Sequence, residues 1–274
     1  MAEKSAAESA APEKEAAPAQ EAKQEKPKTL LSTIVSGKAH MPPRILLYGV
    51  HGIGKSTFAA EAPSPIFIPT EDGANEIDVP KFPVVKDRGE VMAILRELYS
   101  QPHDYQTLVL DSVDWFEDFI QAELRAEKTE KELGYGRESL FAEAMLSDVL
   151  GAFSMLRKKR SMTVVVIAHS EIKRFDSPMT EPYDRYQPKL TPRLSSLLQE
   201  WADVVAFATY DVAVKKEEVG FNREVRRGIS SGDRVIYTEE RPAFYAKNRY
   251  KLPPEMPLNW AKFASKIPYY SAEK

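Results

Sequence analysis

The chain has 274 residues, which is room for one substantial α/β domain with extensions. A hydrophobic fraction of 43% supports a packed core, whereas apolar runs no longer than a strand argue against a membrane-spanning helix, so we expect a cytoplasmic protein without a membrane partner. The absence of cysteine excludes disulfides and thiolate metal sites, and a net charge of −3 excludes a uniformly basic protein that coats nucleic acid.

The chain begins with a segment that is not expected to fold. Residues 1–28 consist mostly of Ala, Glu, Lys, Gln and Pro. Because such a segment cannot bury enough apolar surface to offset its ordering entropy, we predict a disordered tail. Residues 29–43 form a predicted linker whose apolar patch, Leu30–Val35, docks on the chain's own core or on a neighbouring subunit. A single folded domain is predicted over 44–268, followed by a short tail over 269–274.

Strand-like and helix-like runs alternate from the start of this domain. Strands are predicted over 44–48, 65–69, 83–85, 107–111, 163–168 and 203–209. Helices are predicted over 55–61, 89–100, 113–125, 139–160 and 192–201. A turn over 230–233 separates these from two further strands, over 234–238 and 244–247. Near-continuous apolar strands between amphipathic helices predict a mostly parallel sheet covered on both faces, with an antiparallel C-terminal extension.

Directly after the first strand lies the most informative motif of the chain. The run from Gly49 to Thr57 fits the pattern G-x-x-x-x-G-K-[ST], and it lies between a strand and a helix as that pattern requires. Backbone N–H groups in such a loop converge on phosphate oxygens. We therefore predict an α/β P-loop NTPase that binds ATP. The predicted loop contacts are Gly49, His51, Gly52, Ile53, Gly54, Lys55, Ser56 and Thr57.

Three side chains are expected to act on the triphosphate. Lys55 is expected to reach the β- and γ-phosphates, and Ser56 to ligate Mg²⁺ through its hydroxyl. Asp111, which ends a buried apolar run, is the predicted second Mg²⁺ ligand, with a simple helix cap as the alternative. The next residue is Ser112 rather than a glutamate, so a water-activating carboxylate has to come from elsewhere.

The predicted source of that carboxylate is Glu71, just after the strand over 65–69. The carboxyl ends of strands line the ligand crevice in open α/β sheets, and a carboxylate there can orient or deprotonate the attacking water. Asp72 is a close competitor for this role. A plain loop carboxylate beside Gly73 is the remaining alternative.

These motifs, together with a late run from Ala246 to Arg249, resemble the RecA/recombinase family in order and context. The stretch from about Arg44 to Pro254 looks more closely like the shortened RecA-core ATPases of bacteriophages, a group linked to single-strand annealing and phage recombination. The resemblance implies a RecA-like core, a location in the host cytoplasm, and Glu71 as the catalytic base.

The resemblance also implies that part of the active site comes from a second copy of the chain. Lys247 and Arg249 are expected to reach the γ-phosphate bound to the adjacent subunit of a filament or ring. Such a basic finger stabilises charge on the transferred phosphoryl group. A cross-strand pair of surface charges is the alternative for these two residues.

A γ-phosphate sensor and two DNA-facing loops are further implications of the resemblance. His169, directly after the strand over 163–168, stands where many members carry glutamine, and a capping histidine is the alternative. The loops are predicted over 130–138 and 171–189. Cations mixed with aromatics suit single-stranded nucleic acid, because phosphates pair with charge and bases stack. The predicted DNA-binding residues are Arg137, Lys173, Arg174, Arg185 and Lys189.

The sequence therefore predicts a Mg²⁺–ATP-dependent ATPase that assembles with itself and acts on single-stranded DNA in annealing or recombination. A single-strand-binding protein is a further candidate partner. Two alternatives remain open: a replicative-helicase-type motor, and a nucleotide-switched scaffold that recruits replication or recombination partners. A small-molecule P-loop kinase is disfavoured because the chain has no compact arginine-rich lid segment.

Overall fold

The computed structural model describes residues 30–73, 75–218 and 224–271. The chain divides into two compact units, residues 1–39 and residues 40–274. The described part of the first unit begins with a 3-10 helix, η1 (Leu30–Thr33), and the side chains of Leu31, Ile34 and Val35 are exposed. The predicted tail over 1–28 lies outside the described residues, and the docking of the apolar patch stays a prediction.

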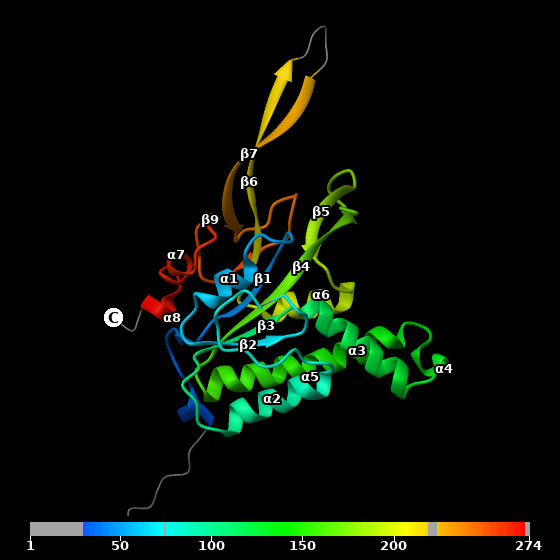
Figure 1. Cartoon of the computed structure of the whole chain (residues 1–274), viewed down its shortest axis with the longest axis vertical. Helices are drawn as coiled ribbons and strands as arrows, with labels where there is room; N and C mark the ends of the chain where they lie inside the picture. Colours follow the sequence, from blue (N-terminus) through cyan, green and yellow to red (C-terminus); the bar gives the residue numbers. More distant parts are fainter. Residues whose placement is uncertain (1–29, 74, 219–223, 272–274) are drawn as a thin grey trace, which may run out of the picture. The chain divides into compact units, whose positions relative to one another are not determined.

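A sheet of nine described strands forms the centre of the second unit, with the main order β2-β3-β4-β1-β6-β7-β9 (Figure 1). Its strands are β1 (Arg44–Gly49), β2 (Pro65–Pro69), β3 (Thr107–Asp111), β4 (Thr163–Phe175), β5 (Tyr183–Pro188), β6 (Val204–Glu218), β7 (Glu224–Tyr237), β8 (Lys247–Asn248) and β9 (Glu255–Pro257). The strands from β2 to β6 in this order are parallel, whereas β5, β7, β8 and β9 pair antiparallel. The predicted mostly parallel sheet with an antiparallel extension is confirmed.

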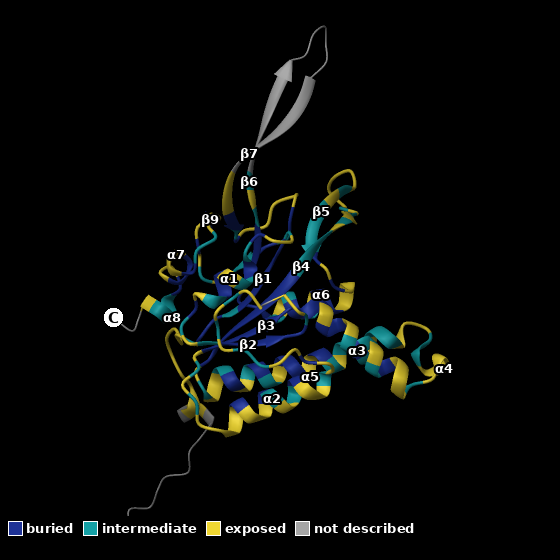
Figure 2. Ribbon diagram, viewed as in Figure 1, coloured by how far each residue is buried: buried dark blue, intermediate teal, exposed yellow. Residues whose placement is uncertain are grey.

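Helices cover both faces of the parallel strands, which are almost fully buried (Figure 2). One face carries α2 (Arg88–Ser100), α3 (Val113–Glu127), α5 (Arg137–Lys159) and α6 (Pro192–Trp201), which share a core cluster with Leu46 and Leu110. The other face carries α1 (Lys55–Ala60), α7 (Trp260–Ala264) and α8 (Pro268–Ser271), around Ile45 and Val165. Because both faces are covered, these strands are continuously apolar rather than alternating.

Among the described helices, α5 is long and apolar enough to cross a membrane by length and composition. Its buried side, which includes Leu146, Val149 and Phe153, packs in the core beside α2, α3 and α6. The helix therefore has the packing of a core element.

One predicted strand, over 83–85, does not form. This segment runs beside β2, and Val85 N–H donates to Pro69 O at 3.0 Å. Pro80 and Pro83 interrupt the segment, however, and proline has no N–H to donate. The result is a few separate hydrogen bonds along the edge of the sheet instead of a ladder.

Three boundaries near the C-terminal end also differ from expectation. The strand predicted over 244–247 forms only at β8, and the turn predicted over 230–233 lies inside β7, where it makes a bulge. The folded part extends to the end of α8, beyond the predicted boundary at 268. There the hydroxyls of Tyr270 and Thr163 lie 2.6 Å apart, which ties this helix to β4.

Gly49, at the end of β1, occupies a position where a side chain has no room. A methyl group on its Cα would lie 2.1 Å from the carbonyl oxygen of Ala208 on β6, whereas nothing lies within 4 Å of the same position on Gly151 in α5. We expect Gly49→Ala to lower the free energy of unfolding by about 1–3 kcal/mol and Gly151→Ala to raise it by about 0.5–1 kcal/mol. Urea unfolding of both variants measures this, and equal effects would contradict the close approach.

Candidate nucleotide site

The predicted phosphate loop forms the turn between β1 and α1, and β6 fixes its start. Val50 N–H donates to Ala208 O at 3.3 Å. Gly52 and Gly54 have φ angles of +71° and +100°, which residues with a Cβ rarely adopt. Beside the loop lies a cavity of about 340 Å³. The residues that line it are Gly52, Gly54, Lys55, Ser56, Thr57, Glu71, Gly73, Ile77, Asp111 and His169.

The lysine of the loop is held in place by the loop's own backbone. Lys55 is 6% exposed, and its ammonium donates to Gly49 O and to Val50 O, each at 3.1 Å. Burial lowers the pKa of Lys55 below its ordinary value. Ile53, in contrast, is fully buried in the apolar core, so only its backbone is available to a ligand.

Ser56 and Asp111 meet in the wall of the cavity, where the serine hydroxyl donates to Asp111 Oδ2 at 2.6 Å. Burial raises the pKa of the Asp111 carboxyl, and a bound cation would favour its ionised form. Mg²⁺ commonly takes one or two protein oxygens and completes its shell with water and phosphate, so this pair fits that ion. No group of three His, Asp or Glu side chains in the described ranges offers a metal site made by protein alone.

Glu71 faces the cavity, whereas the described lining does not include Asp72. The Ser112 hydroxyl donates to Glu71 Oε1 at 3.3 Å. The Thr70 hydroxyl donates to Ser112 O and accepts from Ser112 N–H, both at 2.7 Å, which ties the end of β2 to the end of β3. Asp72 instead accepts a hydrogen bond from Asn75. Of the two candidate bases, Glu71 is therefore the one that lines the cavity.

Asp114 is a residue of this site that the sequence analysis missed. It is 6% exposed at the start of α3, and it accepts hydrogen bonds from His169 N at 3.0 Å and from His169 Nδ1 at 2.8 Å. Burial raises the pKa of Asp114, but the hydrogen bonds from His169 outweigh it, so the pKa lies below its ordinary value. The available signal was the second aspartate in the run Asp111-Ser112-Val113-Asp114.

The hydrogen bond to Asp114 orients the ring of His169 across the cavity. Its Nε2 lies 3.8 Å from Glu71 Oε1. The ring of His51, from the phosphate loop, stacks on the ring of His169 with 4.2 Å between centroids. The positive charge that His169 can carry lowers the pKa of His51. His169 therefore contacts both the candidate base and the loop that is expected to hold phosphate.

Lys247 and Arg249 lie away from the phosphate loop of their own subunit. β8 pairs with the first residues of β6, at the edge of the sheet opposite to the end of β1. Lys247 Nζ donates to Gln199 O at 2.7 Å and to Glu200 O at 3.0 Å, and Arg249 Nη1 donates to Asp203 Oδ1 at 3.1 Å. Lys247 thus caps the C-terminal end of α6. Its reach, and that of Arg249, into a neighbouring subunit stays a prediction.

The two segments expected as DNA-facing loops are regular structure instead. Most of 171–189 belongs to a hairpin of β4 and β5, paired from Ser170 with Pro188 to Phe175 with Tyr183 (Figure 1). The segment over 130–138 contains α4 (Glu130–Leu133), which starts with a Thr129–Glu132 capping box, and the first residues of α5. The loop predictions are therefore wrong for most of both segments: a turn remains at 134–136 and a loop at 176–182, and the expected DNA contacts stay a prediction.

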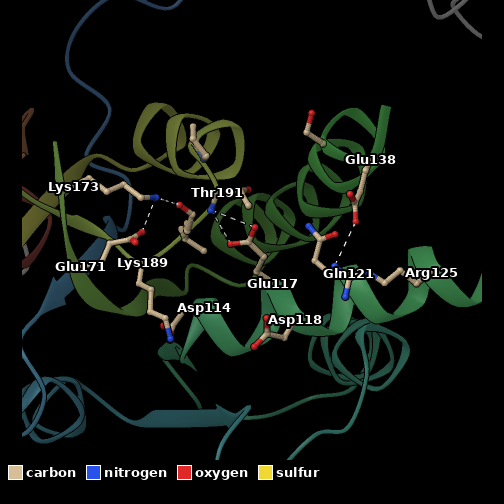
Figure 3. Close-up of a pocket in the computed structure, with 13 residues that line it drawn as sticks. Asp114, Glu117, Asp118, Gln121, Arg125, Glu138, Glu171, Lys173, Lys189 and Thr191 are labelled. Atoms are coloured by element: carbon tan, nitrogen blue, oxygen red, sulfur yellow. Dashed lines mark hydrogen bonds and ion pairs between the residues drawn. The ribbon is translucent and has the colours of Figure 1, made fainter. Parts of the chain in front are cut away.

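Two of the predicted DNA-binding lysines point into a cavity of about 510 Å³ between the hairpin and α3 (Figure 3). Lys173 pairs with Glu171 at 2.7 Å and donates to Leu190 O at 2.9 Å, and Lys189 lines the same cavity. The lining also includes the acidic residues Glu117, Asp118 and Glu138. This concentration of carboxylates makes the cavity itself a poor receptor for a phosphate backbone.

The three predicted DNA-binding arginines differ in the exposure and contacts of their side chains. Arg174, on the hairpin, has a side chain that is 69% exposed, with Asp176 at 3.5 Å. The guanidinium carbon of Arg185 lies 3.8 Å from the ring centre of Phe175, and its side chain is 12% exposed. Arg137 donates to the backbone carbonyls of Gly134, in the turn before α5, and of Lys131 in α4. Arg174 is therefore well exposed, with Asp176 as its ion-pair partner, whereas the side chain of Arg185 is mostly buried.

The family of the chain follows from a match that spans nearly all of these residues. Residues 41–250 match a family described as AAA domain. The chain belongs to the AAA domain family. An AAA domain is a P-loop ATPase module, so the family match confirms the predicted fold class and the expectation that the chain binds a nucleotide. The AAA domain also has a likeness to the crystal structure of the RadB recombinase, with 17% identity and a TM-score of 0.41, covering 78% of this chain and 86% of that one. No curated protein matches the sequence.

Proposed function

We propose that this AAA domain is a RecA-like ATPase of the bacteriophage type, which hydrolyses Mg²⁺–ATP while bound to single-stranded DNA in annealing or recombination. The observation that carries the proposal is the composition of the 340 Å³ cavity: one wall is the phosphate loop, and the other holds Asp111 at the end of β3, Glu71 just beyond β2 and His169 within β4, three adjacent strands. These groups can bind the phosphates, hold Mg²⁺ and orient water for in-line attack on a γ-phosphate.

In this mechanism the chain's own residues divide the work. Lys55 and the loop backbone bind the phosphates, and Ser56 with Asp111 would hold Mg²⁺, which neutralises charge on the phosphates when bound. Glu71 orients the attacking water and takes up its proton. His169, held by Asp114, lies beside Glu71 and is the group best placed to respond to the presence of the γ-phosphate.

The proposal includes assembly of several copies of the chain. Among the described residues that line the cavity, Lys55 is the one lysine or arginine that its own subunit supplies. A basic finger that stabilises the transferred phosphoryl group has to come from elsewhere. Lys247 and Arg249 are at the opposite edge of the sheet, and the side chain of Arg249 is 49% exposed. In a head-to-tail filament or ring, that edge faces the neighbour's site.

For DNA, the proposal rests on the β4–β5 hairpin, with its exposed Arg174 and the aromatic pair Phe175 and Tyr183 at 5.5 Å between ring centroids. We expect single-stranded DNA to raise the rate of ATP hydrolysis about fivefold or more, the lower limit of ordinary coupling between two sites. Phosphate release with and without an oligonucleotide measures this.

Replacing Arg174 by alanine is expected to weaken DNA binding and to reduce the salt dependence of that binding. Arg96→Ala is the matched control, because Arg96 is an exposed arginine on α2.

Other outcomes of the same experiment point to the alternatives. Hydrolysis that does not respond to DNA, by a protein that stays monomeric, would contradict the proposal. Directional displacement of a duplex strand indicates a helicase-type motor. Tight nucleotide binding with very slow turnover under all conditions indicates a nucleotide-switched scaffold.

A further inference from the structure

Arg234 lies against the phosphate loop. Neither the phosphate-loop motif nor the family match singles it out. A methyl group on the Cα of Gly54 would lie 2.8 Å from Arg234 Nη1 and 3.9 Å from Leu258 Cδ2. Gly54 directly precedes Lys55 and lines the nucleotide cavity. The guanidinium of Arg234 therefore occupies the space next to the loop that any larger residue at position 54 would fill.

The backbone of β7 is shaped to put Arg234 there. In the pairing of β6 with β7, Tyr210 is opposite Arg234 and Val212 is opposite Ser230, so three residues of β7 face a single residue of β6. Gly232, in the middle of this bulge, has a φ of +83°. A bulge with a glycine in this conformation bends a strand and redirects the side chains that follow it. The segment that the sequence analysis took for a turn is this bulge.

The environment of Arg234 leaves its charge available to a ligand. Other arginines of this region are paired: Arg185 with Glu240 at 2.9 Å, Arg241 with Glu255 at 3.8 Å. Within the described part of the chain, no carboxylate or aromatic ring holds the guanidinium of Arg234, and the residue is exposed. Its backbone is fixed, because Leu258 N–H donates to Arg234 O at 2.9 Å.

The strand order indicates which phosphates of a bound nucleotide Arg234 can contact. β4, β3 and β2 lie on one side of β1 and carry His169 within β4, Asp111 at the end of β3 and Glu71 just beyond β2, whereas β6 and β7 lie on the other side. The groups for γ-phosphate chemistry are thus on the side away from Arg234. The backbone of a phosphate loop cradles the α- and β-phosphates, and Gly54 is part of that backbone.

We infer that Arg234 binds the α- and β-phosphates of the nucleotide from its own subunit, across Gly54, and so contributes to the affinity for ADP and ATP alike. This inference rests on the proposed nucleotide site. Its role differs from that of a finger from a neighbouring subunit, because it acts on binding and not on the transferred phosphoryl group. A guanidinium suits this task, since its planar fork can donate two hydrogen bonds to phosphate oxygens.

Equilibrium titration with mant-ADP and with a non-hydrolysable mant-ATP analogue tests the inference. Arg234→Ala is expected to weaken both by about 10- to 100-fold, the usual effect of losing a charge-assisted hydrogen bond. Arg234→Lys is expected to recover part of the loss. Arg241→Ala removes the same charge four residues beyond the end of β7, away from Gly54, and is expected to leave both affinities unchanged.

Each other outcome has a definite meaning. Unchanged affinity in Arg234→Ala, or an equal loss in Arg241→Ala, overturns the inference alone, because wild-type binding shows that the site exists. A loss confined to the ATP analogue also overturns it, since Arg234 would then act at the γ-phosphate. If wild-type protein binds neither nucleotide, and Lys55→Ala changes nothing, the proposed function fails and takes the inference with it.

Discussion

Replacing Glu71 by glutamine is expected to lower the rate of ATP hydrolysis by about 100- to 10,000-fold while nucleotide affinity stays within about twofold of wild type. Glutamine keeps the size of the side chain and can still accept the hydrogen bond from Ser112, but it cannot take a proton from water. The reaction therefore loses its base, and the binding cavity keeps its shape. Phosphate release at saturating ATP and titration with a fluorescent nucleotide measure the two quantities separately.

The neighbouring Asp72 provides the matched control for this experiment. Asp72→Asn removes the same charge one residue away, from a side chain that bonds Asn75 instead of lining the cavity. We expect its hydrolysis rate to stay close to wild type. If Asp72→Asn is inactive and Glu71→Gln is active, the base has been assigned to the wrong carboxylate. If both hydrolyse ATP normally, water is activated by a group elsewhere.

Replacing Lys247 by alanine is expected to lower hydrolysis about 1000-fold, because a basic finger from a neighbour supplies that much to phosphoryl transfer. Lys247 also caps α6, so loss of activity alone does not separate the two roles. Mixing Lys247→Ala with a second inactive variant separates the role in hydrolysis from the role as a helix cap. In an equal mixture of Lys247→Ala and Glu71→Gln, about one interface in four joins an intact site to an intact finger, if subunits assemble at random.

Such a mixture is expected to recover about a quarter of wild-type activity although each variant is inactive by itself. The unfolding temperature of Lys247→Ala, compared with wild type, reports on the cap separately. A mixture that remains inactive while both variants assemble would show that Lys247 acts within its own subunit. Full activity of Lys247→Ala alone would remove it from the mechanism.

The sequence was sufficient to predict one half of the candidate site. Asp111 and Glu71 are 40 residues apart in the chain, yet Asp111 ends one buried apolar run and Glu71 comes two residues after another. Because parallel strands all present their carboxyl ends at one edge, the order of elements alone predicts that such residues meet beside the phosphate loop. The covering of both faces was predictable for the same reason, since the strands have no polar side.

The other half depended on pairing between strands, which a single sequence does not specify. Gly232 with its neighbours has the composition of a turn, but a bulge needs the same backbone conformation, and only the register of β6 against β7 distinguishes the two. The partnership of Asp114 with His169 likewise joins residues 55 positions apart, on different elements. Neither the position of Arg234 nor the orientation of His169 follows from local patterns.

β4 passes from the core of the sheet into the hairpin as one uninterrupted strand, with His169 at the nucleotide cavity and Arg174 near the far end. A paired strand has no joint, and each residue adds about 3.3 Å of stiff backbone. The hairpin is therefore an arm and not a flexible loop. We expect a small tilt of the strand where it passes His169 to be magnified at the tip of the hairpin, because a stiff arm turns a small angle at its base into a larger displacement at its end.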